Sequence, residues 1–342
     1  MKTSAKRLQH SKLYAEILGI VVLFSIPILI KDEYFIHILI FAGIYIMLAL
    51  SWNLLAGYAG QLNLGQAAFF GMGAYNAALL TLKVNLSPWL GLLAGGIAAG
   101  IFGVALGFPS LRLKGPYLAI VTIGFSETLR LVIMNWVSLT RGPLGLFGIP
   151  PLTSINIPYI AEFDFSQEKY CYYIIFLLVL LSIWIVNKLV KSRFGLILTS
   201  IREDEVATQS IGINTFKYKL LIFIISAFLA GVAGAFYAYY IRLISPEMLM
   251  ISVTFTILSM AVIGGIGTII GPIIGAVVLT FLSEGLRVMP EFRLIVYGLL
   301  LVLVILFAPK GLMGLIGSII NLTKRNQKEE KAYAETPGKK FS

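Results

Sequence analysis

Two groups of ionisable residues stand out because the sequence around them is strongly apolar. One is a run of four consecutive charged residues between two long apolar segments: Arg202, Glu203, Asp204 and Glu205. The other is Glu127 and Arg130, which lie three residues apart inside an apolar segment and so share one face of a helix. If the segment spans a membrane, Glu127 lies near the centre of the bilayer, where ionised groups are costly. This leaves two interpretations, a functional role or a self-compensating structural pair.

Motifs that would mark an enzyme are missing from the chain. There is no G-x-x-x-x-G-K-[ST] phosphate-binding loop, no H-E-x-x-H and no G-x-S-x-G. The single cysteine, Cys171, excludes an intrachain disulfide, and His10 and His37 are too few for a Cys/His zinc set. We therefore expect no catalysis, no metal site and no cofactor in this chain.

The elements that must position the charged residues are long apolar segments. The chain has 342 residues, 58% hydrophobic and 13% charged, with a mean hydropathy of +0.90. A soluble domain carries about twice that charged fraction. Runs of about 20 apolar residues predict an all-α integral membrane protein, a polytopic bundle of about 8–10 transmembrane helices. We place the segments at 13–30, 34–56, 66–82, 88–108, 116–137, 170–190, 218–241, 252–264, 268–285 and 293–309.

The basic residues predict an orientation. If the N-terminus is inside and the spans alternate, the parts that face the cytoplasm hold 19 of the 27 Lys and Arg residues. The net charge of +11 therefore reflects loops rather than nucleic-acid binding. We expect a cytoplasmic arm at 1–12, a membrane domain at 13–309 with a cytoplasmic loop at 191–217, and a largely disordered cytoplasmic tail at 310–342. Segment 13–30 lacks a small-x-small cleavage site and is expected to be retained as the first helix.

Glycines interrupt the predicted helices at two places. The first break is GYAGQLNLGQ (57–66), and the second break is GGIGTIIGP (264–272). Broken helices in a membrane either line a cavity or pack tightly inside the protein. The candidate residues for a solute path are the neutral amides near the first break and the glycines of the second: Asn53, Gln61, Asn63, Gln66, Gly264, Gly265 and Gly267. If buried, the amides need partners, which are either nearby backbone or a solute.

The charged run opens a predicted short helix on the cytoplasmic side. Acidic residues would lie in its first turn, where they favour the helix dipole, and Gly212 is placed to end it. A small apolar edge of the helix is expected at Ile201, Ala207, Ser210 and Ile211. Such a helix is either a solvated loop element or a docking element for a cytoplasmic partner. Its acids are expected to be exposed, so replacing Glu203, Asp204 and Glu205 together by alanine should cost little stability.

Several stretches, in order along the chain, resemble the LivM-type permease family. They include SWNLLAGYAGQLNLGQAAFFGMGAY (51–75), GPYLAIVTIGFSETLR (115–130), FGLILTSIREDEVATQSIGIN (194–214), GGIGTIIGPIIGA (264–276) and APKGLMG (308–314). Members of that family are membrane subunits of ABC importers for branched-chain amino acids. The resemblance extends from about residue 40 to residue 314, which makes it far more specific than any single glycine motif.

The resemblance implies a multi-subunit importer in the cell membrane of a prokaryote. It implies a LivH-type partner permease, two ABC ATPase subunits that carry ATP and Mg²⁺, an external solute-binding protein and a lipid surrounding. It also implies that REDEVATQSIG is the helix that couples to an ATPase, with Arg202, Glu203, Asp204, Glu205, Ala207 and Gly212 as the coupling residues. Gly212 comes one residue later than in the EAA-loop signature of ABC permeases, and no Leu-Pro follows, so the role of Glu205 itself stays open.

Alternatives to a branched-chain amino acid importer remain at this point. Urea or short-amide importers have very similar permeases, and a homodimeric permease pair is not distinguished from a heterodimeric one. An ion-coupled secondary transporter would need an acid at the membrane midplane that changes protonation. Glu127 is the candidate, but the neighbouring Arg130 would hold it ionised, which argues against proton coupling.

Overall fold

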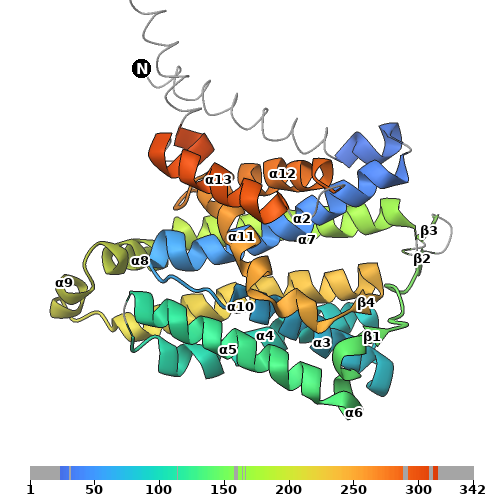
Figure 1. Cartoon of the computed structure of the whole chain (residues 1–342), viewed down its shortest axis with the longest axis horizontal. Coiled ribbons are helices and arrows are strands. Elements are labelled where there is room, and N and C mark those ends of the chain that lie inside the picture. Colours follow the sequence, from blue (N-terminus) through green and yellow to red (C-terminus); the bar gives the residue numbers. More distant parts are fainter. Residues whose placement is uncertain are drawn as a thin grey trace, which may run out of the picture.

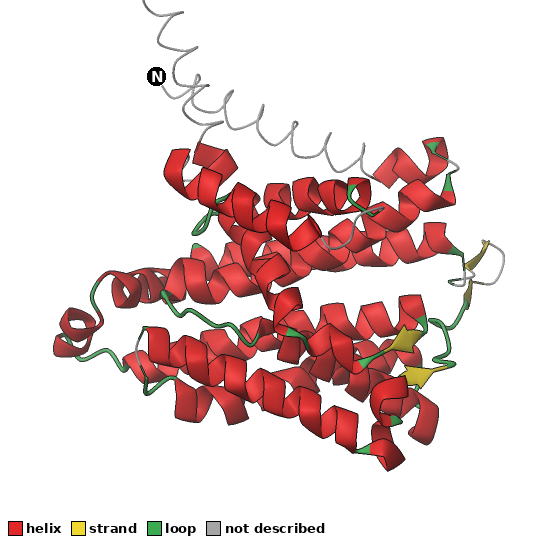
Figure 2. Cartoon of the chain, in the orientation of Figure 1, coloured by secondary structure: helices red, strands yellow, loops and turns green. Residues whose placement is uncertain are grey.

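The computed structural model describes residues 24–30, 32–113, 115–157, 161–163, 165, 167–287, 292–307 and 311–314. Across these residues the chain is almost entirely helical, with a few very short strands (Figure 2). The predicted arm at 1–12, most of the first segment at 13–30 and nearly all of the tail at 310–342 lie outside the described residues. The structure therefore does not test those three predictions.

Six helical stretches in the described part are long and apolar enough to cross a membrane. They are α2 with the π-helical η1 (Glu33–Tyr58), α3 (Gln66–Val84), α4 (Pro88–Ser110), α5 (Pro116–Asn135), α7 (Glu168–Val190) and α10 (Thr215–Ile241). Each overlaps a segment predicted from the sequence. The all-α, polytopic membrane fold is thus confirmed.

Within the described residues, the last three predicted segments form helices that are shorter than membrane spans. They form α11 (Ile251–Gly264), α12 (Ile270–Gly285) and α13 (Phe292–Phe307), of 14, 16 and 16 residues. At 1.5 Å per residue these helices reach about 21–24 Å, less than the roughly 30 Å of a hydrocarbon core. The second break separates α11 from α12, as predicted, so the pair does not form one long helix.

Most of the remaining elements lie at the two ends of the bundle (Figure 1). One end carries α8 (Arg193–Glu203) and α9 (Glu205–Ser210). The opposite end carries α6 (Val137–Thr140), η2 (Gly142–Leu144), β1 (Leu146–Phe147), β2 (Ile155–Ile157), β3 (Ala161–Phe163) and β4 (Leu243–Ile244). The short helix η3 (Pro246–Leu249) follows β4 and contacts α3 and α5. β1 pairs antiparallel with β4, with Leu146 opposite Ile244, and β2 pairs antiparallel with β3.

Close packing of small residues joins the helices. The tightest association is that of α10 with α3 and α4, while α2 packs on α7 and α12. A Cβ on Gly73 of α3 would lie 2.1 Å from the carbonyl oxygen of Gly231 on α10. Contacts this close require glycine, and small residues are the usual means by which helices approach in a membrane. α5 is packed less, with 28% of its apolar stretch buried.

The first break sends the chain back into the bundle. The N-cap of α2 is Asp32, whose carboxylate accepts a hydrogen bond from the Tyr34 N–H at 3.0 Å. At its other end, α2 continues into the π-helix η1. Residues 59–65 then run from the end of the bundle toward its middle, where α3 begins (Figure 1). As a result, the start of α3 is buried, and its first residue Gln66 is 0% exposed.

Labelling from outside should distinguish the two ends of the bundle. Positive residues gather in the loops near α8 and α9, so we expect that end to face the cytoplasm. In a Cys171→Ser background, cysteine at the exposed Ser154 should react with an impermeant thiol reagent in intact cells, and cysteine at the exposed Ser210 should not. Ser192 is less suitable for this purpose because its hydroxyl caps α8. The reverse labelling pattern would contradict the orientation.

Candidate functional site

The charged run lies across a junction between two helices. α8 ends at Glu203, and Asp204 has extended backbone, with φ −152° and ψ 107°. The Asp204 carboxylate accepts hydrogen bonds from the N–H groups of Val206 and Ala207, at 2.9 and 3.0 Å, and so caps α9. The prediction of one helix opening at Arg202 is therefore wrong, because a capping aspartate interrupts it. Gly212 follows α9 at φ +87°, where glycine is favoured, so the predicted end is confirmed.

Glu205 fastens α9 to the start of α10. Its Oε1 lies 2.6 Å from Nζ of Lys219, whose side chain is 2% exposed. Thr215 Oγ1 donates to the same oxygen at 3.2 Å, and Gln209 Nε2 donates to Thr215 Oγ1 at 2.7 Å. The expectation that all three acids are exposed is wrong for Glu205. Lys219 was placed at the start of the predicted segment 218–241 but was not recognised as the partner of Glu205; it lies in the second turn of α10.

The exposed part of α9 has an apolar edge. Val206 and Ile211 are 62% and 74% exposed, and Ala207 and Ser210 beside them are also exposed. Ile201, predicted to belong to this edge, is instead buried at the end of α8. The carboxylate of Glu203 stays at the surface, 3.2 Å from Arg202 Nη2. The edge therefore consists of α9 and the residue that follows it.

Asn53 joins the two breaks. Its Oδ1 accepts from the Gly267 N–H at 2.8 Å, and its Nδ2 donates to the Thr268 carbonyl oxygen at 2.7 Å. Gly265 and Gly267 have φ +126° and +77°, values that side chains with a Cβ rarely adopt. Two predicted path residues, Asn53 and Gly267, are thus bonded to each other, and the Gly265 carbonyl accepts from the Thr268 hydroxyl at 2.9 Å. The described hydrogen bonds of all three residues stay within the protein.

Gly264 serves packing between α11 and α12. A Cβ at this position would lie 1.9 Å from the carbonyl oxygen of Gly271. The same close approach occurs from the other side, where a Cβ on Gly275 would lie 1.8 Å from the carbonyl oxygen of Met260. For Gly264 the geometry thus favours close packing over a solute-lining role.

The other amides near the first break form an internal network. Asn63 Oδ1 accepts from the Gly65 N–H at 2.9 Å, and Asn63 Nδ2 donates to Gln66 Oε1 at 3.0 Å. Gln66 Nε2 in turn donates to Ser51 Oγ at 2.7 Å. Asn63 and Gln66 are 0% exposed, so their hydrogen-bonding groups are directed to the protein. Gln61, whose Nε2 donates to the Ala59 carbonyl at 3.1 Å, lines a cleft.

That cleft brings four stretches of the chain together at one end of the bundle. Its volume is about 360 Å³, and it is lined by residues 59–61, Gly115, residues 201–206 and Lys219. Arg202 reaches across it and donates from Nη1 to the Gly57 carbonyl oxygen at 2.6 Å. The loop predicted to couple to a partner is thus in direct contact with the first break.

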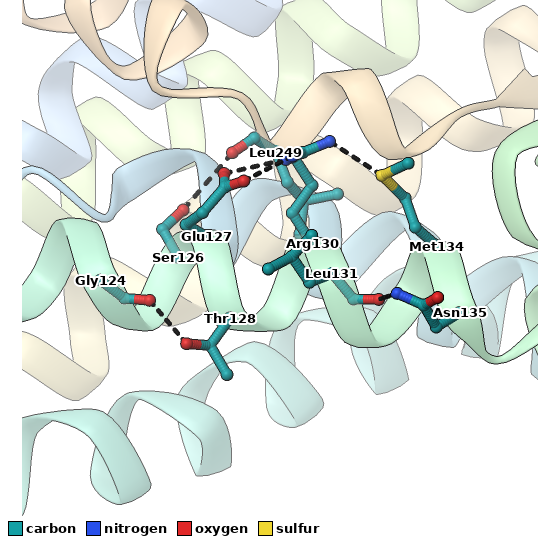
Figure 3. A network of polar contacts seen from close by, with 9 residues as sticks. All are labelled: Gly124, Ser126, Glu127, Thr128, Arg130, Leu131, Met134, Asn135 and Leu249. Atoms are coloured by element: carbon teal, nitrogen blue, oxygen red, sulfur yellow. Dashed lines mark hydrogen bonds and ion pairs between the residues drawn. The ribbon is translucent and has the colours of Figure 1, made fainter.

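Glu127 and Arg130 form a two-pronged ion pair on α5 (Figure 3). Arg130 Nε donates to Glu127 Oε2 at 2.8 Å, and Nη2 contacts Oε1. The Arg130 side chain is 18% exposed, whereas that of Glu127 is 46% exposed. Glu127 also lines a cavity of about 200 Å³ with Leu64 of the first break and Leu249 of η3. The predicted pair is present, and the cavity beside it was not evident from the sequence.

Comparison with known proteins identifies the family. The model described as "Branched-chain amino acid transport system / permease component" matches residues 34–305, which is well over half of the chain. The chain belongs to this permease family. LivM of Salmonella typhimurium, a high-affinity branched-chain amino acid transport system permease protein, is 34% identical over 306 residues, covering 84% of this chain and 72% of LivM. No solved structure matches.

Two further relatives show the range of the family. LivH of Salmonella typhimurium, another high-affinity branched-chain amino acid permease protein, is 28% identical to this permease over 290 residues, covering 79% of this chain and 91% of LivH. The nucleoside ABC transporter permease protein NupC of Lactococcus lactis is 27% identical over 191 residues, covering 52% of this chain and 59% of NupC. The resemblance to LivM-type permeases is therefore confirmed.

The permease has a second polar cluster at the end opposite α8 and α9. His37 Nδ1 and Tyr240 Oη are 2.6 Å apart, and Glu168 Oε1 lies 3.8 Å from the same nitrogen. Nearby, Glu284 contacts Tyr34 and forms an ion pair with Arg287 at 3.2 Å. These contacts agree with a structural role for Glu284 and Arg287 near a helix end. The sequence did not indicate the partners of His37, which come from other helices.

Proposed function

We propose that this permease forms one half of the solute pathway of an ATP-driven importer and that α5 contributes the wall of that half. The observation that carries the proposal is the uncovered face of α5. Its apolar stretch is the least buried of the six spans together with that of α7, yet the half-exposed carboxylate of Glu127 lies near its middle. A charge facing lipid there is costly, which supports coverage by water and a second permease subunit.

The family favours branched-chain or related neutral amino acids as the solute. Such a solute is a zwitterion without net charge and with an apolar side chain, so its path needs no ring of fixed charge. Conduction also requires binding weak enough for release. The residues of the two breaks carry no charge, which is consistent with this demand. We expect a pore of low selectivity, with solute choice made by an external binding protein.

The partners follow from the same proposal. The chain is similar to both LivM and LivH, which supports pairing with a LivH-type permease into a pseudo-symmetric pore. Of the two ATPase subunits, which supply ATP and Mg²⁺ chemistry, one would dock on the apolar edge of α9, with exposed charge at Glu203 adding complementarity. The solute-binding protein would dock at the opposite end of the bundle. The complex would lie in a prokaryotic cell membrane with both termini cytoplasmic.

Other solutes define the alternatives. A urea or short-amide importer would use a very similar permease, and the NupC relative adds nucleosides as a specific second candidate. An ion-coupled transporter is less well supported, because Arg130 already forms two hydrogen bonds with the Glu127 carboxylate. Each alternative gives a different result in one transport assay.

That assay is uptake by the reconstituted complex. The chain is co-expressed with its partner permease, ATPases and binding protein, and placed in liposomes that contain ATP. We expect uptake of radiolabelled leucine that requires ATP and the binding protein, with isoleucine and valine competing. Competition by urea or uridine, but not by valine, would assign another solute. Uptake driven by a proton gradient without ATP would contradict the importer itself.

A further inference from the structure

The contact between Arg202 and the first break has a defined physical origin. In a continuous α-helix the Gly57 carbonyl would accept from the N–H four residues later, at Gln61. Here the Gln61 N–H instead donates to the Leu55 carbonyl at 2.9 Å, because the chain leaves the helix through η1. Arg202 Nη1 donates to the Gly57 carbonyl at 2.6 Å in its place. A charge-assisted bond from the coupling loop thus satisfies a carbonyl left by the helix end.

The same guanidinium lies against the second break. A Cβ built on Gly267 would be 3.3 Å from Arg202 Nη1 and 3.5 Å from the Gly57 carbonyl oxygen. A Cβ on Gly57 would be 2.7 Å from the Gly267 nitrogen and 2.2 Å from Asn53 Oδ1. A side chain at Gly57 would therefore clash with Asn53 and Gly267, and one at Gly267 would lie in tight contact with Arg202. We name these four residues the latch.

The latch leaves little freedom between the coupling loop and the breaks. Gly60, at φ +65°, packs closely against the aliphatic part of the Arg202 side chain, because a Cβ on Gly60 would lie 2.9 Å from Arg202 Cγ. A shift of α8 must therefore break the bond to Gly57 or move the backbone of both breaks. Glycines at positive φ are positions where that backbone can turn. Glu203, 3.2 Å from Nη2, offers Arg202 an alternative partner.

We infer that Arg202 is a positioning residue that transmits movement of the coupling loop to both glycine breaks at once. This rests on the proposed function, in which the loop moves with an ATPase. It differs from a docking role, because Nη1 of Arg202 donates to the Gly57 carbonyl of the permease itself rather than to a partner subunit. The two breaks respond together since Asn53 bonds to Gly267 and Thr268 from the helix that carries Gly57.

The first measurement is the ratio of ATP hydrolysed to solute imported, in proteoliposomes that hold the whole complex. Arg202→Ala should raise this ratio about tenfold, because movement of the loop no longer reaches the breaks. Arg202→Lys, which keeps the charge and most of the length, should restore part of the coupling. The matched control is Arg112→Ala, an exposed arginine outside the latch whose guanidinium lies 5.0 Å from the Phe108 ring.

The second measurement reads the second break directly. Cysteine replaces Ile266, which is 44% exposed, in a Cys171→Ser background. Its reaction rate with a thiol reagent should differ between the nucleotide-free and the vanadate-trapped complex when Arg202 is present. In Arg202→Ala the two rates should be equal, and in Arg112→Ala they should differ as in the parent.

The outcomes separate this inference from the proposed function. Absence of ATP-driven uptake by the parent complex would contradict the proposed function. Normal uptake with an unchanged ratio in Arg202→Ala, or a parallel fall of hydrolysis and uptake, would overturn the latch while leaving the importer intact. Failure of both Arg202 variants to assemble, with Arg112→Ala assembling, would assign Arg202 a purely structural role and also overturn it.

Discussion

Replacing Glu205 by alanine is expected to lower the free energy of unfolding by about 3 kcal/mol or more, because removing one partner of a buried ion pair leaves the other charge uncompensated. In this variant the ammonium group of Lys219, whose side chain is 2% exposed, would lose its ion-pair partner. The measurement is the apparent melting temperature and the yield of the purified complex in detergent. The loop should detach from α10 in the variant, so transport should fall as well.

Its neighbours provide matched controls. Glu203→Ala removes an acid that is 68% exposed, and exposed pairs contribute at most about 1 kcal/mol, so its melting temperature should match the parent. Asp204→Ala removes the cap of α9 and should cost about 1 kcal/mol. The double variant Glu205→Ala/Lys219→Met should be more stable than Glu205→Ala, because no buried charge remains. Equal melting temperatures for Glu203→Ala and Glu205→Ala would contradict this account.

The membrane spans could be predicted because their physics is local. A run of about 20 apolar residues can satisfy its backbone in a bilayer only as a helix, so composition alone locates α2, α4 and α7 to within a few residues. The end of α9 at Gly212 is also a local property of glycine. The interruption at Asp204 was missed, since an aspartate after Glu203 can belong to a helix or cap the next one.

Contacts between distant segments could not be predicted. Asn53 bonds to Thr268 across 215 positions of the sequence, and no periodicity indicates that pairing. The sequence shows that buried amides need hydrogen-bond partners, but it does not show whether a given partner is the backbone or a solute. Likewise, Lys217 and Lys219 lie two residues apart on the same helix, and only the packing around α10 buries Lys219 while Lys217 is exposed. These parts of the site depend on topology rather than on local pattern.

Glu127→Gln is expected to lower the amount of folded permease several-fold. The variant keeps one carbonyl acceptor for Arg130 but loses the opposite charge. An unpaired arginine at the centre of a membrane helix costs about 2.5–3.5 kcal/mol on insertion scales. Fluorescence-detected size-exclusion chromatography of the complex measures the folded amount. Glu127→Asp, which retains the charge, is the matched control and should lose less.

A double variant decides between the two interpretations of the pair. Glu127→Gln/Arg130→Gln contains no ion, so a self-compensating structural pair predicts recovery of the folded complex and of transport. Recovery of folding without transport would instead place the pair in the solute path, where the cavity shared with Leu64 and Leu249 offers space beside Glu127. Normal folding of Glu127→Gln with loss of transport alone would lead to the same conclusion. We expect the structural outcome, because both Glu127 oxygens bond to Arg130 and a net-neutral solute needs no fixed charge on its path.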